Sequence, residues 1–402
     1  MLAKTQKGDV SMKDQRVWGV ALAFILLLSL LIGCNQGSNT KTIKIGHAAS
    51  LTGDNSVFGQ SEATGLKIAV EEINKKGGML GKQVELISVD TRSDPAEASN
   101  AVRRLVDQEK VNFVIGPSQS GSTLAATPIV TAAKIPLIAA AASNPYVTVS
   151  KSGETYKYVF RVCFIDTYQG RVIADFVYDR LNVRKAAILY DIGSDYSQWL
   201  AKYFEDSFVK RGGTIVGKEA YRTGELDFRA PLGKIKETHP DLVFLPLTQK
   251  DGALAAKQVR DLGISAIIMG GDTWASPDIL PLGGKALEGA YFTNLTSFEV
   301  PKVQQWVAQN EKRFGGPIVR NALLVNDALL WLADAVNRAG TTDGDKVVAA
   351  LEQTKDLPVL TTDKFTVDAK THDPLNRPAF FFTVKDGKFV FVETYAARAA
   401  AN

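Results

Sequence analysis

The sequence predicts an α/β protein built from two doubly wound lobes, each with a mainly parallel sheet between helices. Short β-rich runs alternate with amphipathic stretches along most of the chain, which is typical of parallel sheets covered on both faces. This alternation occurs twice, once on each side of a loop. The chain has 402 residues, and more than 300 remain after the N-terminal segment is set aside, which is more than one hydrophobic core usually serves.

The first round of alternation predicts four strands and three helices. The strands are expected at residues 42–48, 83–90, 113–115 and 137–140. The helices between them are expected at 62–75, 96–109 and 122–134. Asp94-Pro95 is a good helix start, with Asp as the cap and Pro in the first turn, and Gly77-Gly78 is a good stop.

The second round has the same form, and a mixed tail follows it. Its strands are expected at 186–190, 214–220, 242–245 and 266–269, and its helices at 196–211, 228–238 and 251–262. The tail predicts a strand at 290–294, helices at 303–314, 322–339 and 346–352, and strands at 380–384 and 388–394. Asp386-Gly387 between the last two strands indicates a hairpin turn. No low-complexity linker separates the lobes, which favours a chain that crosses between them several times and forms a hinge.

Residues 1–33 predict a signal peptide and are excluded from fold reasoning. Lys13 and Arg16 precede an apolar run over 17–32, which is short for a stable membrane span of ~20 residues. We therefore expect the protein in the periplasm or at the cell surface.

The end of the apolar run resembles a bacterial lipobox. Leu31 and Gly33 precede Cys34 at the switch from apolar to polar sequence, although Ile32 is bulkier than the Ala or Ser usual at that place. We expect cleavage before Cys34, a lipid on its thiol that holds the protein to a bacterial membrane, and a polar tether over 34–40. The alternative is a plain signal anchor with a chance cysteine.

Charge and cysteine content argue against nucleic-acid binding and against an intrachain disulfide. The net charge is +4, and four basic and two acidic residues in the first 33 leave about +2 for the rest, without a basic stripe. Nucleic acid is therefore not an expected partner. Only two cysteines occur, and lipid on Cys34 leaves Cys163 without an intrachain partner, so we expect Cys163 to be a small buried apolar residue.

The sequence carries no pattern of a catalytic or metal site. The three histidines, His47, His239 and His372, are not paired with a Ser or Cys in a known nucleophile motif. The segment 116–121 differs from the G-x-S-x-G elbow by one position, and no P-loop or metal-ligand spacing occurs. We expect no catalytic residues, no metal and no cofactor.

Four predicted strand ends are rich in small hydroxyl residues, and ligands of parallel α/β sheets lie beyond such ends. These segments are 50–53, 116–123, 139–145 and 269–274. Ser120 and Ser122 lie where a helix begins, so hydroxyl and free backbone N–H groups there suit a carboxylate, and Asp272 suits an ammonium. Together they indicate an α-amino acid. The alternative is structural: the two serines cap the helix, and Asp272 caps a turn.

The chain beyond the signal peptide resembles the branched-chain (Leu/Ile/Val-type) amino-acid binding proteins of bacterial ABC importers, which are type I periplasmic binding proteins, over nearly its whole length. The matching segments are Ile45–Gly53, Phe58-Gly59, Gly65, Glu72–Gly78, Asp94-Pro95, Val114–Pro117, Phe160-Arg161, Asp166 and Gln169-Gly170. The resemblance implies two lobes, three crossovers and closure on the ligand by hinge bending. Lobe 1 is expected over 41–163 and 296–378, and lobe 2 over 164–295 and 379–396.

The resemblance also implies roles for individual residues. Ser120 matches the serine that binds the ligand carboxylate, and Ala141 matches a residue whose backbone carbonyl accepts from the ammonium. Ser143 stands where the family often has Thr, with the same hydroxyl role. Asp272 stands where a family acid binds the ammonium, and Tyr196 matches an aromatic residue contributed by the second lobe.

The pocket for the ligand side chain departs from the family pattern. Phe58 matches an aromatic residue that lines this pocket, but Thr248 stands where leucine-type binders have an aromatic residue, and Asn321 falls near an apolar position. Ser93 and Gln119 replace the cysteines of a family disulfide. These departures imply a roomier or more polar pocket, so the resemblance does not establish Leu, Ile or Val as the ligand.

These observations predict a solute-binding lipoprotein and not an enzyme. It would capture a branched-chain or other neutral amino acid by lobe closure and deliver it to an ABC permease with its own ATPase. The alternative is a ligand-sensing receptor or regulator on the same fold, which binds an amide, urea or an aromatic acid and signals instead of delivering.

Overall fold

The computed structural model describes residues 42–375 and 377–395. The expectations for the signal peptide, for lipid on Cys34 and for the tether fall outside these residues. Among the described residues, no helix combines the length and the hydropathy that a membrane span needs.

The first lobe contains a five-stranded parallel sheet in the order β2-β1-β3-β4-β5. Its strands are β1 (Ile43–Ala49), β2 (Val84–Asp90), β3 (Phe113–Ile115), β4 (Leu137–Ala139) and β5 (Val159–Arg161). Its helices are α2 (Ser56–Lys75), α3 (Pro95–Asp107), α4 (Ser120–Ala133), α11 (Arg320–Ala339) and α12 (Gly344–Glu352). After β1 the chain continues through α2 to β2 on one side of the sheet order, and after β3 it continues through α4 to β4 on the other side. The adjacent strands β1 and β3 therefore form a topological switch point, where ligands of such sheets bind.

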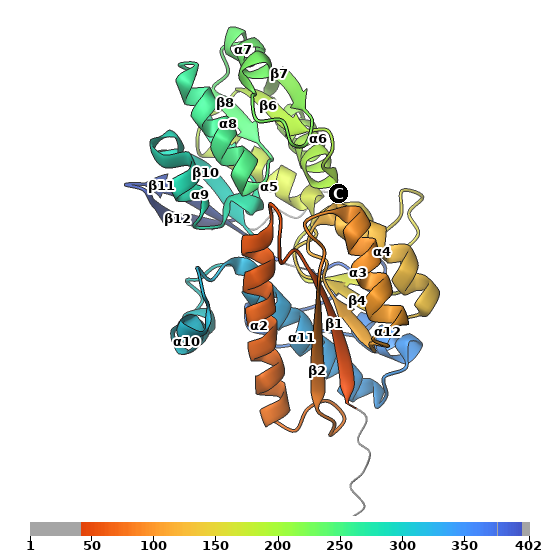
Figure 1. Cartoon of the computed structure of the whole chain (residues 1–402). Coiled ribbons are helices and arrows are strands. Elements are labelled where there is room, and N and C mark those ends of the chain that lie inside the picture. Colours follow the sequence, from red (N-terminus) through yellow and green to blue (C-terminus); the bar gives the residue numbers. More distant parts are fainter. Residues whose placement is uncertain (1–41, 376, 396–402) are drawn as a thin grey trace, which may run out of the picture. The chain divides into compact units, whose positions relative to one another are not determined.

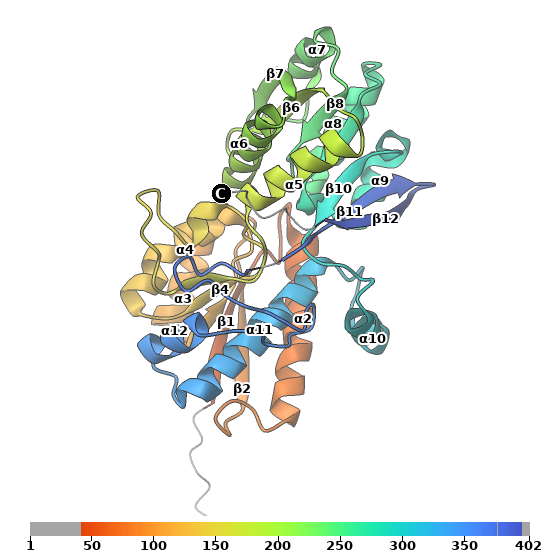
Figure 2. The same ribbon diagram turned by 180° about the vertical axis from the view of Figure 1, so that it is seen from behind.

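The second lobe contains a seven-stranded sheet in the order β12-β11-β10-β9-β8-β6-β7. Its strands are β6 (Lys185–Asp191), β7 (Thr214–Tyr221), β8 (Leu242–Leu245), β9 (Ile267–Gly270), β10 (Tyr291–Asn294), β11 (Ala379–Lys385) and β12 (Lys388–Tyr395). Its helices are α5 (Asp166–Asp179), α6 (Asp195–Lys210), α7 (Arg229–Glu237), α8 (Gln249–Asp261) and α9 (Ile279–Gly283); Figure 2 shows them from behind. Helix α10 (Pro301–Asn310) lies on the chain between β10 and α11.

The expected α/β class with two parallel-rich sheets is confirmed, and so are several local signals. The Asp94 side chain accepts hydrogen bonds from two backbone N–H groups in the first turn of α3. Asp386 and Gly387 both have left-handed φ values, of 53° and 68°, in the turn between the antiparallel strands β11 and β12. Strand β5 and helix α5 were not among the expected elements, and α2 begins at Ser56 instead of residue 62.

Helices α2 and α11 pack directly against each other, as both ribbon views show. The contact is tight at Gly65, where an added Cβ would lie 2.7 Å from the backbone oxygen of Ala322. This packing matters for function because the first turns of both helices reach the same cavity, through Phe58 on α2 and Arg320 on α11.

We predict that Gly65→Ala destabilises the protein, because its methyl group meets rigid backbone of α11 and overpacking costs ~1–3 kcal/mol. Urea denaturation of the variant measures the change in the free energy of unfolding. Gly233→Ala in α7 is the matched control: its Cβ meets nothing within 4 Å, so Ala should leave stability unchanged or raise it by up to ~1 kcal/mol. Equal effects of the two substitutions would contradict the packing argument.

Candidate functional site

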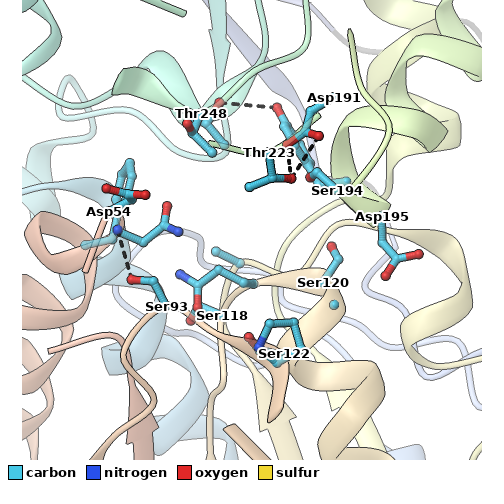
Figure 3. Close-up of a pocket in the computed structure, with 18 of the residues that line it drawn as sticks. Asp54, Ser93, Ser118, Ser120, Ser122, Asp191, Ser194, Asp195, Thr223 and Thr248 are labelled. Atoms are coloured by element: carbon cyan, nitrogen blue, oxygen red, sulfur yellow. Dashed lines mark hydrogen bonds between the residues drawn. The ribbon is translucent and has the colours of Figure 1, made fainter. Parts of the chain in front are cut away.

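A cavity of about 230 Å³ lies at the carboxyl ends of strands from both sheets. It is lined by segments that follow β3 in the first lobe and β6, β8 and β9 in the second, together with the first turns of α2 and α11. A dry cavity of ~150 Å³ holds benzene, so this volume suits a small solute with somewhat more atoms. In Figure 3, Ser118, Ser120 and Ser122 lie across the cavity from Asp191 and Thr223.

The first-lobe side chains at the start of α4 are uncharged, and the Asp195 carboxylate of the second lobe lies beside them, with Oδ2 3.3 Å from the Cβ position of Gly121. Ser120 and Ser122 are buried in the first turn of the helix, and Gln119 at the N-cap makes no side-chain capping bond. The Ser120 hydroxyl accepts a hydrogen bond from the backbone N–H of Asn144 at 3.2 Å, so it does not cap its own helix. Hydroxyl groups and the partial positive charge of a helix N-terminus therefore face the cavity together.

The second-lobe wall is acidic. The Asp191 carboxylate accepts from the Thr223 hydroxyl at 2.7 and 2.9 Å, and the Asp251 carboxylate accepts from the Tyr221 hydroxyl at 2.7 Å. Burial raises the pKa of Asp251, and the negative charge of Asp191 adds to that rise, while the hydrogen bond from Tyr221 opposes it. In all, the cavity lining contains five aspartates and one arginine, so an anionic group is disfavoured next to these carboxylates.

A buried ion pair joins the two lobes at the cavity. Arg320 Nη2 lies 2.8 Å from Asp272 Oδ2, and the two residues are 3% and 1% exposed. Asp272 Oδ1 accepts from Gln169 Nε2 at 2.8 Å and from the Tyr196 hydroxyl at 2.9 Å. The Arg320 guanidinium also lies over the Phe58 ring, 4.9 Å from its centre. Asp272 thus has a cationic partner within the protein, which the sequence analysis did not predict.

The Asp166 carboxyl and the Cys163 thiol are also buried and interact with the charge of Asp272, but they do not line the cavity. Burial, followed by the charge of Asp272, raises the pKa of the Asp166 carboxyl well above its usual range. Burial also raises the pKa of the Cys163 thiol to about 12, and its side chain is buried as expected. Among the described residues, no group of three His, Cys, Asp or Glu side chains is placed to hold a metal ion.

The structure brings most of the expected site residues into one cavity. Those that line it are Phe58, Ser120, Ser122, Ala141, Tyr196, Thr248 and Asp272. Ser143 is not among the lining residues, and it is buried. The roles expected for all eight residues remain predictions.

Sequence reasoning missed Arg320, Ser118 and Asp191 as lining residues. Ser118 was within one of the hydroxyl-rich strand ends, and Asp191 directly follows Tyr190 at the end of β6, so both had a detectable signal. Arg320 lies at the start of a helix far along the chain, and no local pattern connects it to the strand ends.

Comparisons with known proteins agree with this architecture. Residues 42–388 match the family model described as periplasmic binding protein. A Leu/Ile/Val-binding protein of Rhizobium johnstonii is 31% identical over 319 residues, which cover 79% of this chain and 85% of the relative. A leucine-, isoleucine-, valine-, threonine- and alanine-binding protein of Pseudomonas aeruginosa is 29% identical over 311 residues, covering 77% of this chain and 82% of the relative.

Two solved structures are similar to this chain in both sequence and fold. A leucine-binding protein from Thermotoga maritima is 31% identical with a TM-score of 0.81, covering 88% of this chain and 98% of its own. A branched-chain amino acid transporter substrate-binding protein from Streptococcus pneumoniae, in complex with isoleucine, is 31% identical with a TM-score of 0.81, covering 89% and 100%.

We predict that Asp272→Asn lowers the free energy of unfolding by ~3–5 kcal/mol, because it leaves the Arg320 charge buried without its partner. Replacing both residues by apolar ones, as Asp272→Leu with Arg320→Met, should recover most of that loss. Asp195→Asn is the control, since Asp195 lines the same cavity but makes no salt bridge among the described residues. Urea denaturation of the four proteins measures these differences; equal stability of Asp272→Asn and the parent would contradict the importance of the pair.

Proposed function

The chain belongs to the periplasmic binding protein family and is a solute-binding protein of an ABC transporter, and we propose that its solute is a neutral L-α-amino acid bound between the two lobes. Proteins of this family bind solutes for transporters and are not enzymes. The amino-acid ligand is supported by the relatives that bind leucine, isoleucine and valine, and by the charges around the cavity.

One observation carries this proposal: a helix N-terminus with two serines lies in the same small cavity as several aspartates, with Asp191 on the opposite side. An α-amino acid has a carboxylate and an ammonium on the same carbon, so it needs an anion-binding and a cation-binding wall within its own length. The cavity offers both.

We assign the two charged groups of the ligand to these walls. The carboxylate would accept hydrogen bonds from Ser120, Ser122 and the free N–H groups in the first turn of α4. The ammonium would donate to the backbone carbonyl of Ala141 and to Asp272. A carboxylate has about four acceptor sites, and three are used by Gln169, Tyr196 and Arg320, so Asp272 retains capacity on Oδ2.

Lobe closure is the proposed mode of capture, with the lobes divided as residues 41–163 with 296–378 and 164–295 with 379–396. Contacts between the lobes support it. Asn144 donates to the backbone oxygen of Asp195 at 3.2 Å, and Lys250 pairs with Asp54 at 2.7 Å near the cavity edge. Such contacts would form on closure and break when the solute passes to a permease powered by an ATPase.

We further propose that the protein is held at a bacterial membrane through lipid on Cys34. The support is sequence alone, since Cys34 lies outside the described residues. A short polar tether would leave the binding lobes free to meet a permease in the same or a neighbouring membrane.

We predict that a neutral L-amino acid raises the melting temperature in a concentration-dependent way, since a ligand at 100 times its Kd stabilises the folded state by ~2.7 kcal/mol. Ser120→Ala should weaken this binding about 10- to 100-fold, the loss of one hydrogen bond to a charged group. Ser99→Ala in α3 is the control: it loses a bond to the backbone oxygen of Ala125, away from the cavity. If only acids without an amino group shift the melting temperature, the amino-acid assignment is wrong.

For the anchor, we predict that Cys34→Ser moves the protein from the membrane fraction to the medium or periplasm, or leaves an uncleaved precursor. Fractionation and mass spectrometry of the N-terminal peptide measure this. The control is Cys163→Ser, which leaves the anchor intact. Membrane association and processing that are unchanged by Cys34→Ser would remove the lipoprotein proposal.

A further inference from the structure

Three residues of the cavity lining have buried polar atoms that no part of the protein satisfies. Arg320 Nε and Nη1, Asn321 Oδ1 and Ser118 Oγ are buried and have no hydrogen-bond partner in the structure. All three residues line the cavity, and each is at least nine-tenths buried. Buried polar groups in native proteins are almost always hydrogen-bonded, so several such atoms at one cavity indicate a missing partner.

Arg320 supplies the donors in this group. Its ion pair with Asp272 uses only Nη2, and a guanidinium has five N–H donors in a fixed fork. The pair also holds the guanidinium in place, because Asp272 is itself fixed by Gln169 and Tyr196. The remaining N–H groups of Arg320 are therefore prearranged donors.

Asn321 supplies the acceptor, and a hydrogen bond to a residue outside the cavity lining fixes the orientation of its amide. Its Nδ2 donates to Glu62 Oε1, while the other Glu62 oxygen lies 3.6 Å from His47 Nε2. A carboxylate only accepts hydrogen bonds, so the amide nitrogen of Asn321 must face Glu62. Its carbonyl oxygen is then the atom without a partner. Glu62 and His47 are positioning residues, since they do not line the cavity.

The charges of the cavity exclude most side chains that a ligand could place here. An apolar side chain would leave all of these donors and acceptors unpaired. A carboxylate would meet the Asn321 oxygen and an aspartate-rich lining. An ammonium or guanidinium has no acceptor for the unpaired N–H groups of Arg320. A neutral group that both accepts and donates suits all three residues, and a primary carboxamide has that combination.

We propose that Arg320, Asn321 and Ser118 form a subsite for a carboxamide side chain, so the solute is an amino acid of the glutamine or asparagine kind. The ligand carbonyl accepts from Arg320, and the ligand amide donates to Asn321 Oδ1. Thr248 extends the polar wall: it is the N-cap of α8, yet its side chain makes no capping bond. This inference rests on the proposed function, because it assumes that the rest of the cavity holds an α-amino acid.

Calorimetric titration of the purified chain with L-glutamine, L-asparagine, L-leucine, L-glutamate and L-lysine tests the proposal. We expect glutamine or asparagine to bind at least 10-fold more tightly than the other three. Tightest binding of leucine would overturn the carboxamide subsite and leave the neutral amino-acid function standing, whereas tightest binding of glutamate or lysine would overturn both. Binding of none of the amino acids in a broader set of neutral ones would overturn the proposed function itself.

Asn321→Leu tests the acceptor. It should weaken amide binding about 10- to 100-fold, the effect of one buried hydrogen bond, and strengthen leucine binding, so that the preference shifts to the apolar ligand. Asn326→Leu is a matched control: Asn326 lies on the same helix and is equally buried, at 2%, but does not line the cavity. It should leave the glutamine-to-leucine affinity ratio unchanged.

Ser118→Ala is a second test of the subsite, which is needed if the melting curve of Asn321→Leu shows that this variant does not fold. Ser118 lies in the loop before α4, and its hydroxyl bonds to nothing in the protein. Its removal should therefore leave the melting temperature of the free protein unchanged and weaken amide binding several-fold. An unchanged glutamine-to-leucine ratio in both folded variants would overturn the subsite.

Discussion

The buried ion pair between Arg320 and Asp272 determines how the cavity is built. A charge inside a protein is tolerated only beside a partner, and these two residues come from different lobes. The pair therefore connects the end of β9 to the start of α11, and the bonds from Gln169 and Tyr196 extend it into the second lobe. It also neutralises the single arginine of the lining, so a bound solute meets oriented donors instead of a net positive charge.

The architecture could be predicted from sequence because local rules dominate it. Alternating β-rich and amphipathic segments, the Asp94 cap and the Asp386-Gly387 turn each act over a few residues, and the structure has them where they were expected. The start of α2 could not be predicted in this way. Residues 56–61 lack an amphipathic pattern, and the helix there is supported by distant contacts, such as the bond from the backbone N–H of Val319 to the Ser61 hydroxyl.

Candidate residues that follow predicted strands could be identified from the sequence, including the serines at the start of α4, but Arg320 at the start of α11 could not. Parallel strands of one sheet have their carboxyl ends at the same edge, so Ser120 and Ala141 could be grouped from this rule. Asp272 follows a strand of the other sheet and lies with them because both lobes line the cavity. Arg320 reaches the cavity only because α11 packs on α2, which is a tertiary contact. Ser143 also follows a predicted strand, but it is buried and is not among the lining residues, and its expected role remains a prediction.

The packing of α2 against α11 also bears on how the chain folds. Glu62 and Asn321, which bond across this contact, are 259 residues apart in sequence. The first lobe cannot complete its core until nearly the whole polypeptide has been synthesised, and contacts of such separation form slowly. The first lobe is therefore expected to stay unfolded for longer after its N-terminal part is synthesised than a lobe made of one continuous segment.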